Sequence, residues 1–158
     1  MSNTVYNYKL KTIKGEPLDL SNYKGKKILL VNTASACGLT PQYKQLEELQ
    51  ENFKDKLQII GLPCNDFAGQ EPGTEQDIAK FCEVNYNITF PLTAKVKIVG
   101  EPDPIYQFLT QKELNGFGSS EVAWNFQKYL IDENGNLIGI FAPPIEPLDE
   151  EILSALGK

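Results

Sequence analysis

Two dense apolar runs dominate the pattern of hydrophobic and polar positions along the chain. Residues 27–33 (KILLVNT) and 57–62 (LQIIGL) are short and rich in branched side chains, which is typical of strands buried on both faces. Between them, apolar residues recur at helical spacing at Tyr43, Leu46, Leu49 and Phe53. Thr40 and Pro41 precede this segment as the expected N-cap and first helical residue. The pattern therefore predicts a buried β-α-β unit.

The other segments extend this unit into a longer alternation of strands and helices. Short strands are predicted at 6–10 and 18–20, an extended segment at 90–98, and strands at 126–132 and 136–141. Helices are predicted from Thr74 to about Cys82, from Asp103-Pro104 to about Lys112, and over 149–156. Asn134-Gly135, between the last two strands, is a favoured hairpin dipeptide. The predicted order is β-α-β-α-β-α-β-β-α, an α/β fold with a mixed sheet and helices on both faces.

The length and continuity of the chain predict one domain over residues 1–158. A chain of 158 residues can bury one sizeable core, and it contains no internal repeat or linker-like stretch.

Cys37 lies between the first core strand and its helix, which is the arrangement of a thioredoxin-like fold. Threonine stands at position 40, where a disulfide oxidoreductase would carry a second cysteine, so a lone attacking thiol is favoured. The free N–H groups and the positive dipole end of a helix N-terminus favour a thiolate over a thiol. The competing interpretation is a small buried cysteine at the end of a strand.

The basic residues narrow the chemistry further. All fifteen are lysines, and the sequence contains neither histidine nor arginine. Ser-His and Cys-His pairs and histidine-ligated metal sites are therefore excluded, and no guanidinium can clamp a carboxylate or phosphate. The formal net charge of −6 disfavours nucleic acid and anionic membranes as partners.

The three cysteines, Cys37, Cys64 and Cys82, are odd in number and far apart, so they form neither a disulfide framework nor a C-x-x-C zinc motif. Residues 1–10 are polar and lack the apolar region of a secretory signal, and no apolar run is long enough to span a bilayer. We therefore expect a cytoplasmic protein without a metal or an organic cofactor.

Three longer segments resemble a known family. Residues 31–43 (VNTASACGLTPQY), 62–73 (LPCNDFAGQEPG) and 124–130 (WNFQKYL) are similar, in the right order, to the three signature blocks of the glutathione peroxidase family. Residues 21–27 and 89–95 also fit its pattern. The resemblance implies a catalytic tetrad that falls here on Cys37, Gln70, Trp124 and Asn125.

The resemblance also implies a role for a second cysteine. Cys82 lies where the thioredoxin-dependent, non-selenium members carry their resolving cysteine. Without the family, Cys82 would be interpreted as a buried core residue, because it shares a helix face with Ile78 and Phe81. Cys64 is expected to be structural. The implied function is reduction of hydrogen peroxide or organic hydroperoxides through a Cys37 sulfenic acid and a Cys37–Cys82 disulfide, recycled by a thioredoxin-type dithiol.

The chain departs from the family pattern in its charges. It has no arginine to bind the glutathione carboxylates, and residues 138–145 lack the basic residue that the family usually carries there. The insertion of tetrameric members is absent between Lys112 and Ser120, so a monomer or weak dimer is expected.

Three alternatives stay open from the sequence. One is a glutathione-dependent peroxidase in which Cys82 is idle, and another is a peroxide sensor that passes oxidation to a partner protein. A catalytically silent binding module is disfavoured, because all four tetrad positions are intact.

Overall fold

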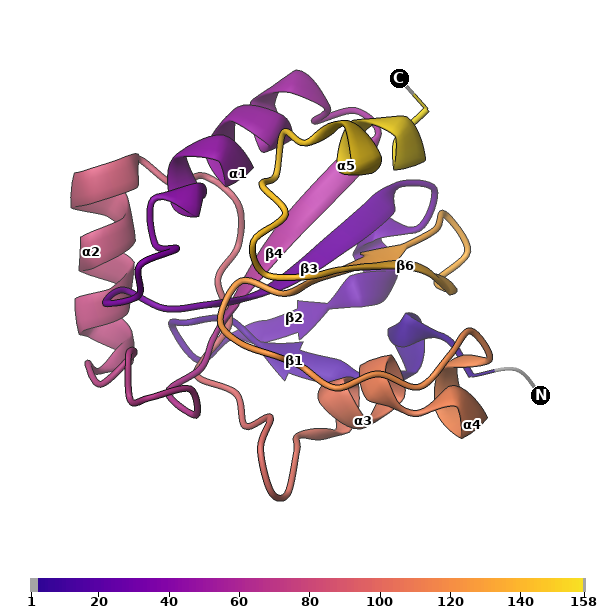
Figure 1. The fold of residues 1–158 in the computed structure, drawn as a ribbon, viewed down its shortest axis with the longest axis horizontal. Helices are drawn as coiled ribbons and strands as arrows, with labels where there is room; N and C mark the ends of the chain where they lie inside the picture. Colours follow the sequence, from indigo (N-terminus) through magenta and orange to yellow (C-terminus); the bar gives the residue numbers. More distant parts are fainter. Residues whose placement is uncertain (1–2, 158) are drawn as a thin grey trace.

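A four-stranded mixed sheet forms the centre of the molecule (Figure 1). The computed structural model describes residues 3–157. The strands lie in the order β4-β3-β5-β6, with bounds β3 (Lys27–Thr33), β4 (Leu57–Pro63), β5 (Lys128–Ile131) and β6 (Leu137–Phe141). β3 pairs in parallel with β4 and antiparallel with β5, and β5 pairs antiparallel with β6. The predicted mixed sheet and the Asn134-Gly135 hairpin are thus confirmed.

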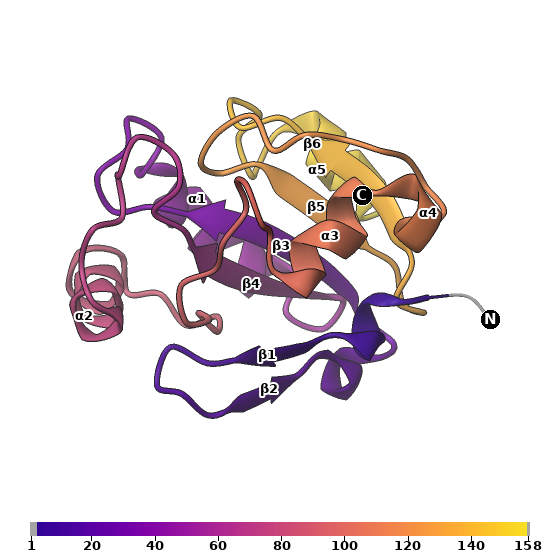
Figure 2. The same ribbon diagram turned by 90° about the horizontal axis from the view of Figure 1, so that it is seen from below.

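Helices cover both faces of this sheet. α1 (Gln42–Asn52), α2 (Glu75–Tyr86) and α5 (Glu150–Ala155) contribute to the core on one face, and α3 (Pro104–Thr110) contributes to the core on the other. The short helix α4 (Lys112–Asn115) follows α3 directly. A separate hairpin of β1 (Lys9–Lys11) and β2 (Pro17–Asp19) lies on the β4 side of the sheet (Figure 2). Two 3₁₀ turns, Val5–Asn7 and Leu20–Tyr23, flank this hairpin.

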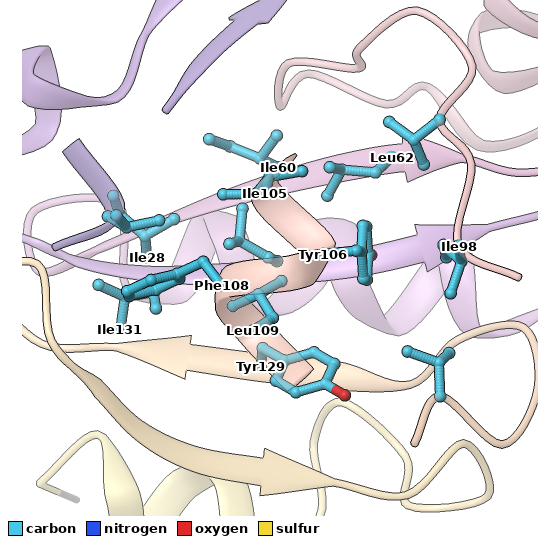
Figure 3. Packing of buried hydrophobic residues seen from close by; sticks show 14 of the residues in the cluster. Ile28, Ile60, Leu62, Ile98, Ile105, Tyr106, Phe108, Leu109, Tyr129 and Ile131 are labelled. Carbon is cyan, nitrogen blue, oxygen red and sulfur yellow. The ribbon is translucent and has the colours of Figure 1, made fainter. Parts of the chain in front are cut away.

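The alternation of side chains along β3 divides the core into two layers. Ile28 and Leu30 face α3, whereas Leu29 and Val31 face α1, and all four are fully buried. Figure 3 shows the first layer, in which Tyr106, Phe108 and Leu109 of α3 pack over the sheet. Full burial of such a side chain stabilises the fold by about 1.5–3 kcal/mol. Because both faces of the sheet are covered, every position from 28 to 31 gains from an apolar side chain.

The predicted extended segment 90–98 is not a strand of the sheet. Only Leu92 and Thr93 form isolated bridges, to Gly61 of β4 and to Thr12 respectively. Gly61 donates to Pro91 O and accepts from Thr93 N, at 3.0 and 2.9 Å. The next ladder bond would need an N–H at Pro63, which proline lacks, so the regular ladder is interrupted there. Pro63 O still accepts from Val96 N at 2.8 Å, but no strand forms around this single bond. The prediction of a strand at 90–98, the third in the predicted order, is therefore wrong.

Several predicted boundaries also differ from the structure. α2 continues to Tyr86, four residues beyond Cys82, and the helix expected from Asp103 breaks at Gln111 into α3 and α4. β5 starts at Lys128, because Phe126 has a left-handed backbone with φ of 69° that no strand accommodates. Among residues 3–157, no helix is both long and apolar enough to cross a membrane.

Gly61→Ala should destabilise the fold, because this glycine lies where β4 and the 90–93 segment approach closely. An added Cβ would come within 2.7 Å of Leu92 Cδ2 and 3.3 Å of Phe90 Cε1, both on buried side chains. Overpacking of this kind costs about 1–3 kcal/mol of unfolding free energy, which urea unfolding would measure. Gly118→Ala, which meets nothing within 4 Å, is the control. Equal stability of the two variants would contradict this close approach.

Candidate active site

Cys37 lies in a tight loop between β3 and α1, with a side chain only 9% exposed. The backbone N–H of Leu39 donates to Cys37 Sγ at 3.3 Å. The Cys37 N–H itself donates to Thr40 Oγ1 at 2.9 Å, and Thr40 N donates back to Cys37 O at 3.0 Å. The loop thus directs a backbone N–H at the sulfur, in a sequence that has no histidine to serve as a donor there.

Thr40 has a different role from the predicted one. It does not cap α1, because the helix begins at Gln42 and Pro41 takes the N-cap position. Its hydroxyl instead accepts from Cys37 N and donates to Ala34 O at 2.8 Å. A threonine thus closes the loop at the position where an oxidoreductase has its second cysteine.

Gln70 and Asn125 are joined to each other and to the cysteine loop. Asn125 Nδ2 donates to Gln70 Oε1 at 2.9 Å, and Ala36 N donates to Gln70 O at 3.0 Å. Gln70 follows β4 in a turn whose residues Ala68 and Gly69 both have left-handed backbones. These contacts bring two predicted site residues, far apart in sequence, to the Cys37 loop.

Trp124 is partly exposed and packs against the same turn. Its ring centroid lies 5.8 Å from that of Phe67, and the side chain is 37% exposed. Asn32 of β3 holds this segment: its Nδ2 donates to Trp124 O at 3.1 Å. Asn32 also accepts at its backbone O from Phe126 N, at 2.6 Å, and at Oδ1 from Gln127 N, at 3.1 Å.

Three loops therefore meet at one edge of the sheet. Cys37 and Gln70 follow the carboxyl ends of the parallel strands β3 and β4, whereas Trp124 and Asn125 precede β5. Because β5 is antiparallel to β3, its beginning lies at the same edge as the end of β3. Carboxyl ends of parallel strands are the usual site of ligands in α/β sheets.

A buried lysine, which the sequence pattern does not single out, holds the segment after β6 next to the start of α1. Lys128 Nζ donates to the carbonyl oxygens of Pro143 and Ile145, and Gln42 Nε2 donates to Pro143 O at 2.9 Å. Burial lowers the pKa of Lys128 to about 7. A hollow next to the Cys37 turn has a volume of about 190 Å³. It is lined by Gly38, Leu39, Pro41, Gln42, Gln45, Pro144 and Glu146.

Cys82 belongs to α2 and is buried, with an exposed fraction of 1%. It belongs to the same core layer as Cys37 and shares its helix face with the buried Ile78, as the spacing predicts. Burial raises the pKa of Cys82 to about 11. Both cysteines are free thiols, so in this structure Cys82 is a core residue and Cys37 carries no disulfide.

Cys64 lies in the other core layer and is fully buried. Burial raises the pKa of its thiol to about 12, so Cys64 is protonated at neutral pH and its expected structural role stays a prediction. Among residues 3–157, no three histidine, cysteine or acidic side chains are grouped so as to hold a metal ion.

Comparisons with known proteins agree with this geometry. The family model described as "Glutathione peroxidase" matches residues 5–110. A glutathione peroxidase of Lactococcus lactis is 46% identical over 96% of this chain and 98% of its own length. A glutathione peroxidase-like peroxiredoxin of Saccharomyces cerevisiae is 42% identical over the full length of both chains.

A solved structure bears on the fold alone. A thioredoxin family thiol:disulfide interchange protein from Chlorobium tepidum superposes with a TM-score of 0.66 at 17% identity, over 99% of this chain and 98% of that one. The predicted thioredoxin-like fold is thus confirmed. From the matching family model and the near-complete alignment to two relatives, we conclude that this chain belongs to the glutathione peroxidase family.

Proposed function

We propose that this protein is a thiol peroxidase in which the Cys37 thiolate attacks the O–O bond of hydrogen peroxide or an organic hydroperoxide. The sulfur is oxidised by two electrons to sulfenic acid, and the leaving oxygen takes a proton and departs as water or alcohol. The observation that carries the proposal is the meeting of Cys37, Gln70 and Asn125 at one sheet edge, with a backbone N–H already directed at the sulfur.

The side chains around Cys37 are assigned to transition-state stabilisation. The amides of Gln70 and Asn125 and the indole N–H of Trp124 are uncharged donors that remain active at any physiological pH. Donors held in place by other contacts stabilise developing negative charge without reorganising. The Asn125–Gln70 hydrogen bond and the attachment of Trp124 to Asn32 provide that fixed placement.

Cys82 is assigned to the second step, as the thiol that resolves the sulfenic acid. Its thiol would attack Cys37 sulfur, forming an S–S bond and expelling water. A thioredoxin-type dithiol would then reduce the disulfide by exchange, in keeping with the yeast relative's description as a peroxiredoxin. Among the residues that line the hollow next to the Cys37 turn, Glu146 is the charged one. Its negative charge would repel the carboxylates of glutathione.

This second step requires α2 to change. Cys82 lies in the third turn of a helix that is closed at its start by a Thr74–Asp77 capping box. A disulfide requires the two sulfurs to approach to about 2.05 Å, and Cys82 is now packed beside Ile78 and Tyr43. We infer that part of α2 unwinds when the disulfide forms.

Single-domain organisation, a monomeric or weakly dimeric state and a cytoplasmic location stay predictions from the sequence.

Replacing Cys82 by serine should abolish peroxide turnover with a thioredoxin–thioredoxin reductase couple but preserve one stoichiometric oxidation of Cys37. The reason is that the sulfenic acid still forms and then lacks an internal thiol. NADPH consumption measures turnover, and Cys64→Ser is the matched control that should retain it. Undiminished turnover by Cys82→Ser, with thioredoxin or with glutathione, would refute the resolving role.

Gln70→Ala should slow the oxidation of Cys37 by about 10²-fold, which is the usual loss for one oxyanion-type donor. The step is followed by mixing reduced protein with peroxide and recording the change in tryptophan fluorescence. Gln76→Ala, on the exposed face of α2, should react like the unmodified protein. Equal rates for Gln70→Ala and Gln76→Ala would remove Gln70 from the catalytic set.

Oxidation should lower the hydrogen-exchange protection of residues 78–86 by at least tenfold, because those amides lose their helical partners. Mass spectrometry of the reduced and the peroxide-treated protein would measure this loss. Residues 42–52 of α1 serve as the internal reference and should keep their protection. Equal protection of α2 in both states would show that Cys82 reaches Cys37 without unwinding, or not at all.

A further inference from the structure

The loop of residues 64–71, between β4 and α2, joins the other parts of the candidate site. Gln70 belongs to this loop, and its carbonyl oxygen accepts from the N–H of Ala36 in the cysteine loop. Its side-chain oxygen accepts from Asn125 Nδ2. The ring of the phenylalanine in the same loop lies 5.8 Å from that of Trp124. The shape of the 64–71 loop therefore determines how Gln70 is placed among the site residues.

The backbone of this loop has a conformation that alanine rarely adopts. Ala68 and Gly69 both lie in the left-handed region, with φ of 57° and 60°. Glycine enters this region without strain, but an alanine Cβ there comes too close to its own backbone. Such residues persist only where surrounding contacts hold them. The loop therefore depends on the contacts that close it.

Asn65 makes a closing contact between the two ends of the loop. Its Oδ1 accepts from the backbone N–H of Glu71 at 2.9 Å. A longer hydrogen bond lies inside the loop, from Gln70 N to Phe67 O at 3.3 Å. Asn65 itself is exposed, whereas Glu71 is only 1% exposed. Loss of the Asn65 oxygen would therefore deprive a buried N–H of this partner.

The N–H of Glu71 and the carbonyl of Gln70 belong to one peptide group. Because the group is planar and trans, its two polar atoms point in opposite directions and turn together. Asn65 accepts from the N–H, and the N–H of Ala36 donates to the carbonyl oxygen at 3.0 Å. The group is thus held from both sides, and a rotation would break both hydrogen bonds. The Cα of Gln70 is bonded to this group, so the direction of the Gln70 side chain depends on it.

We propose that Asn65 is a positioning residue for the peroxide step, which holds the Gln70–Glu71 peptide group against the Cys37 loop and so fixes the direction of the Gln70 amide. This inference rests on the proposed peroxidase function and on the role assigned there to Gln70. Because Oε1 of Gln70 accepts from Asn125, its Nε2 group is the end that can donate to sulfur or to a peroxide oxygen. Asn65 acts on that donor through the backbone.

Asp66 offers a contrast within the same loop. Its Oδ2 accepts from the backbone N–H groups of Ile98 and Val99, at 2.7 and 3.1 Å. These bonds join the loop to the segment before α3, and neither involves the Gln70–Glu71 peptide group. Hydrogen bonds to a carboxylate are stronger than those to a neutral amide oxygen. Asp66→Ala is therefore a control for the general stability of the loop.

The test measures the peroxide step alone. Reduced protein is mixed with hydrogen peroxide, and the fluorescence of the single tryptophan is recorded, while mass spectrometry of quenched samples follows the loss of the free Cys37 thiol. Asn65→Ala should slow this step about tenfold, because the Gln70 amide is still present but is no longer held in place. Urea unfolding gives the stability of each variant.

Two further variants separate positioning from stability. Asn65→Asp should restore the rate to within about threefold, since a carboxylate oxygen accepts from the Glu71 N–H as an amide oxygen does. Asp66→Ala should react at the unmodified rate, although it is expected to lower the stability at least as much as Asn65→Ala does.

A double-variant cycle tests whether Asn65 acts through Gln70. Gln70→Ala alone should slow the peroxide step about 10²-fold. Adding Asn65→Ala should slow it by less than about twofold more, because no amide is left to position. Independent effects would instead multiply to about 10³-fold.

Any one of four outcomes would overturn the inference. The first is an unmodified rate for Asn65→Ala, and the second is a rate for Asn65→Asp as low as that of Asn65→Ala. The third is equal slowing by Asp66→Ala, which would trace the effect to loosening of the loop in general. The fourth is multiplied effects in the double variant. If peroxide does not oxidise Cys37 in the unmodified protein, the proposed function itself fails, and this distinguishes the two claims.

Discussion

The arrangement of the site depends on the hydrogen bonds of one buried residue, Asn32. It belongs to the central strand β3, and its amide joins Trp124 O and Gln127 N while its backbone O accepts from Phe126 N. An asparagine in an otherwise apolar strand costs free energy unless its polar atoms are paired, and here they are paired with backbone of another segment. The same strand that ends at the Cys37 loop therefore fixes the segment that carries Trp124 and Asn125.

The absence of histidine and arginine shapes the chemistry in the same way. With no side chain of those types available, the hydrogen bond to Cys37 Sγ comes from a backbone N–H, and the neighbouring loops bring two neutral amides, Gln70 and Asn125, to the site. Such donors do not titrate, so their effect depends on placement rather than on protonation. The placement comes from short hydrogen bonds between loops, as between Asn125 and Gln70.

The two thiols assigned to the proposed reaction are both buried in one core layer, but to different degrees. Cys37 precedes α1 and is 9% exposed, whereas Cys82 is 1% exposed in α2, and burial raises the pKa of Cys82 to about 11. A thiol that stays protonated and buried does not react with peroxide itself. Its burial also means that an attack on Cys37 needs movement of α2.

The amino-acid pattern alone predicts the buried strands β3 and β4, the capped start of α2, the last hairpin and the position of Cys37 before a helix, because hydrophobic period and capping are local properties. The motif resemblance supplied Gln70, Trp124 and Asn125, which periodicity does not distinguish from ordinary loop residues. Only the tertiary structure shows that 90–98 forms a single bridge to β4, at Leu92 and Gly61, and no strand, since Pro63 offers no N–H to continue the ladder. It also shows that Thr40 closes the cysteine loop instead of capping α1, and that Asn32 and Lys128 hold the segments around the site. These roles depend on which polar atoms of distant segments lie close together in the interior, and the pattern of residues along the chain does not show this.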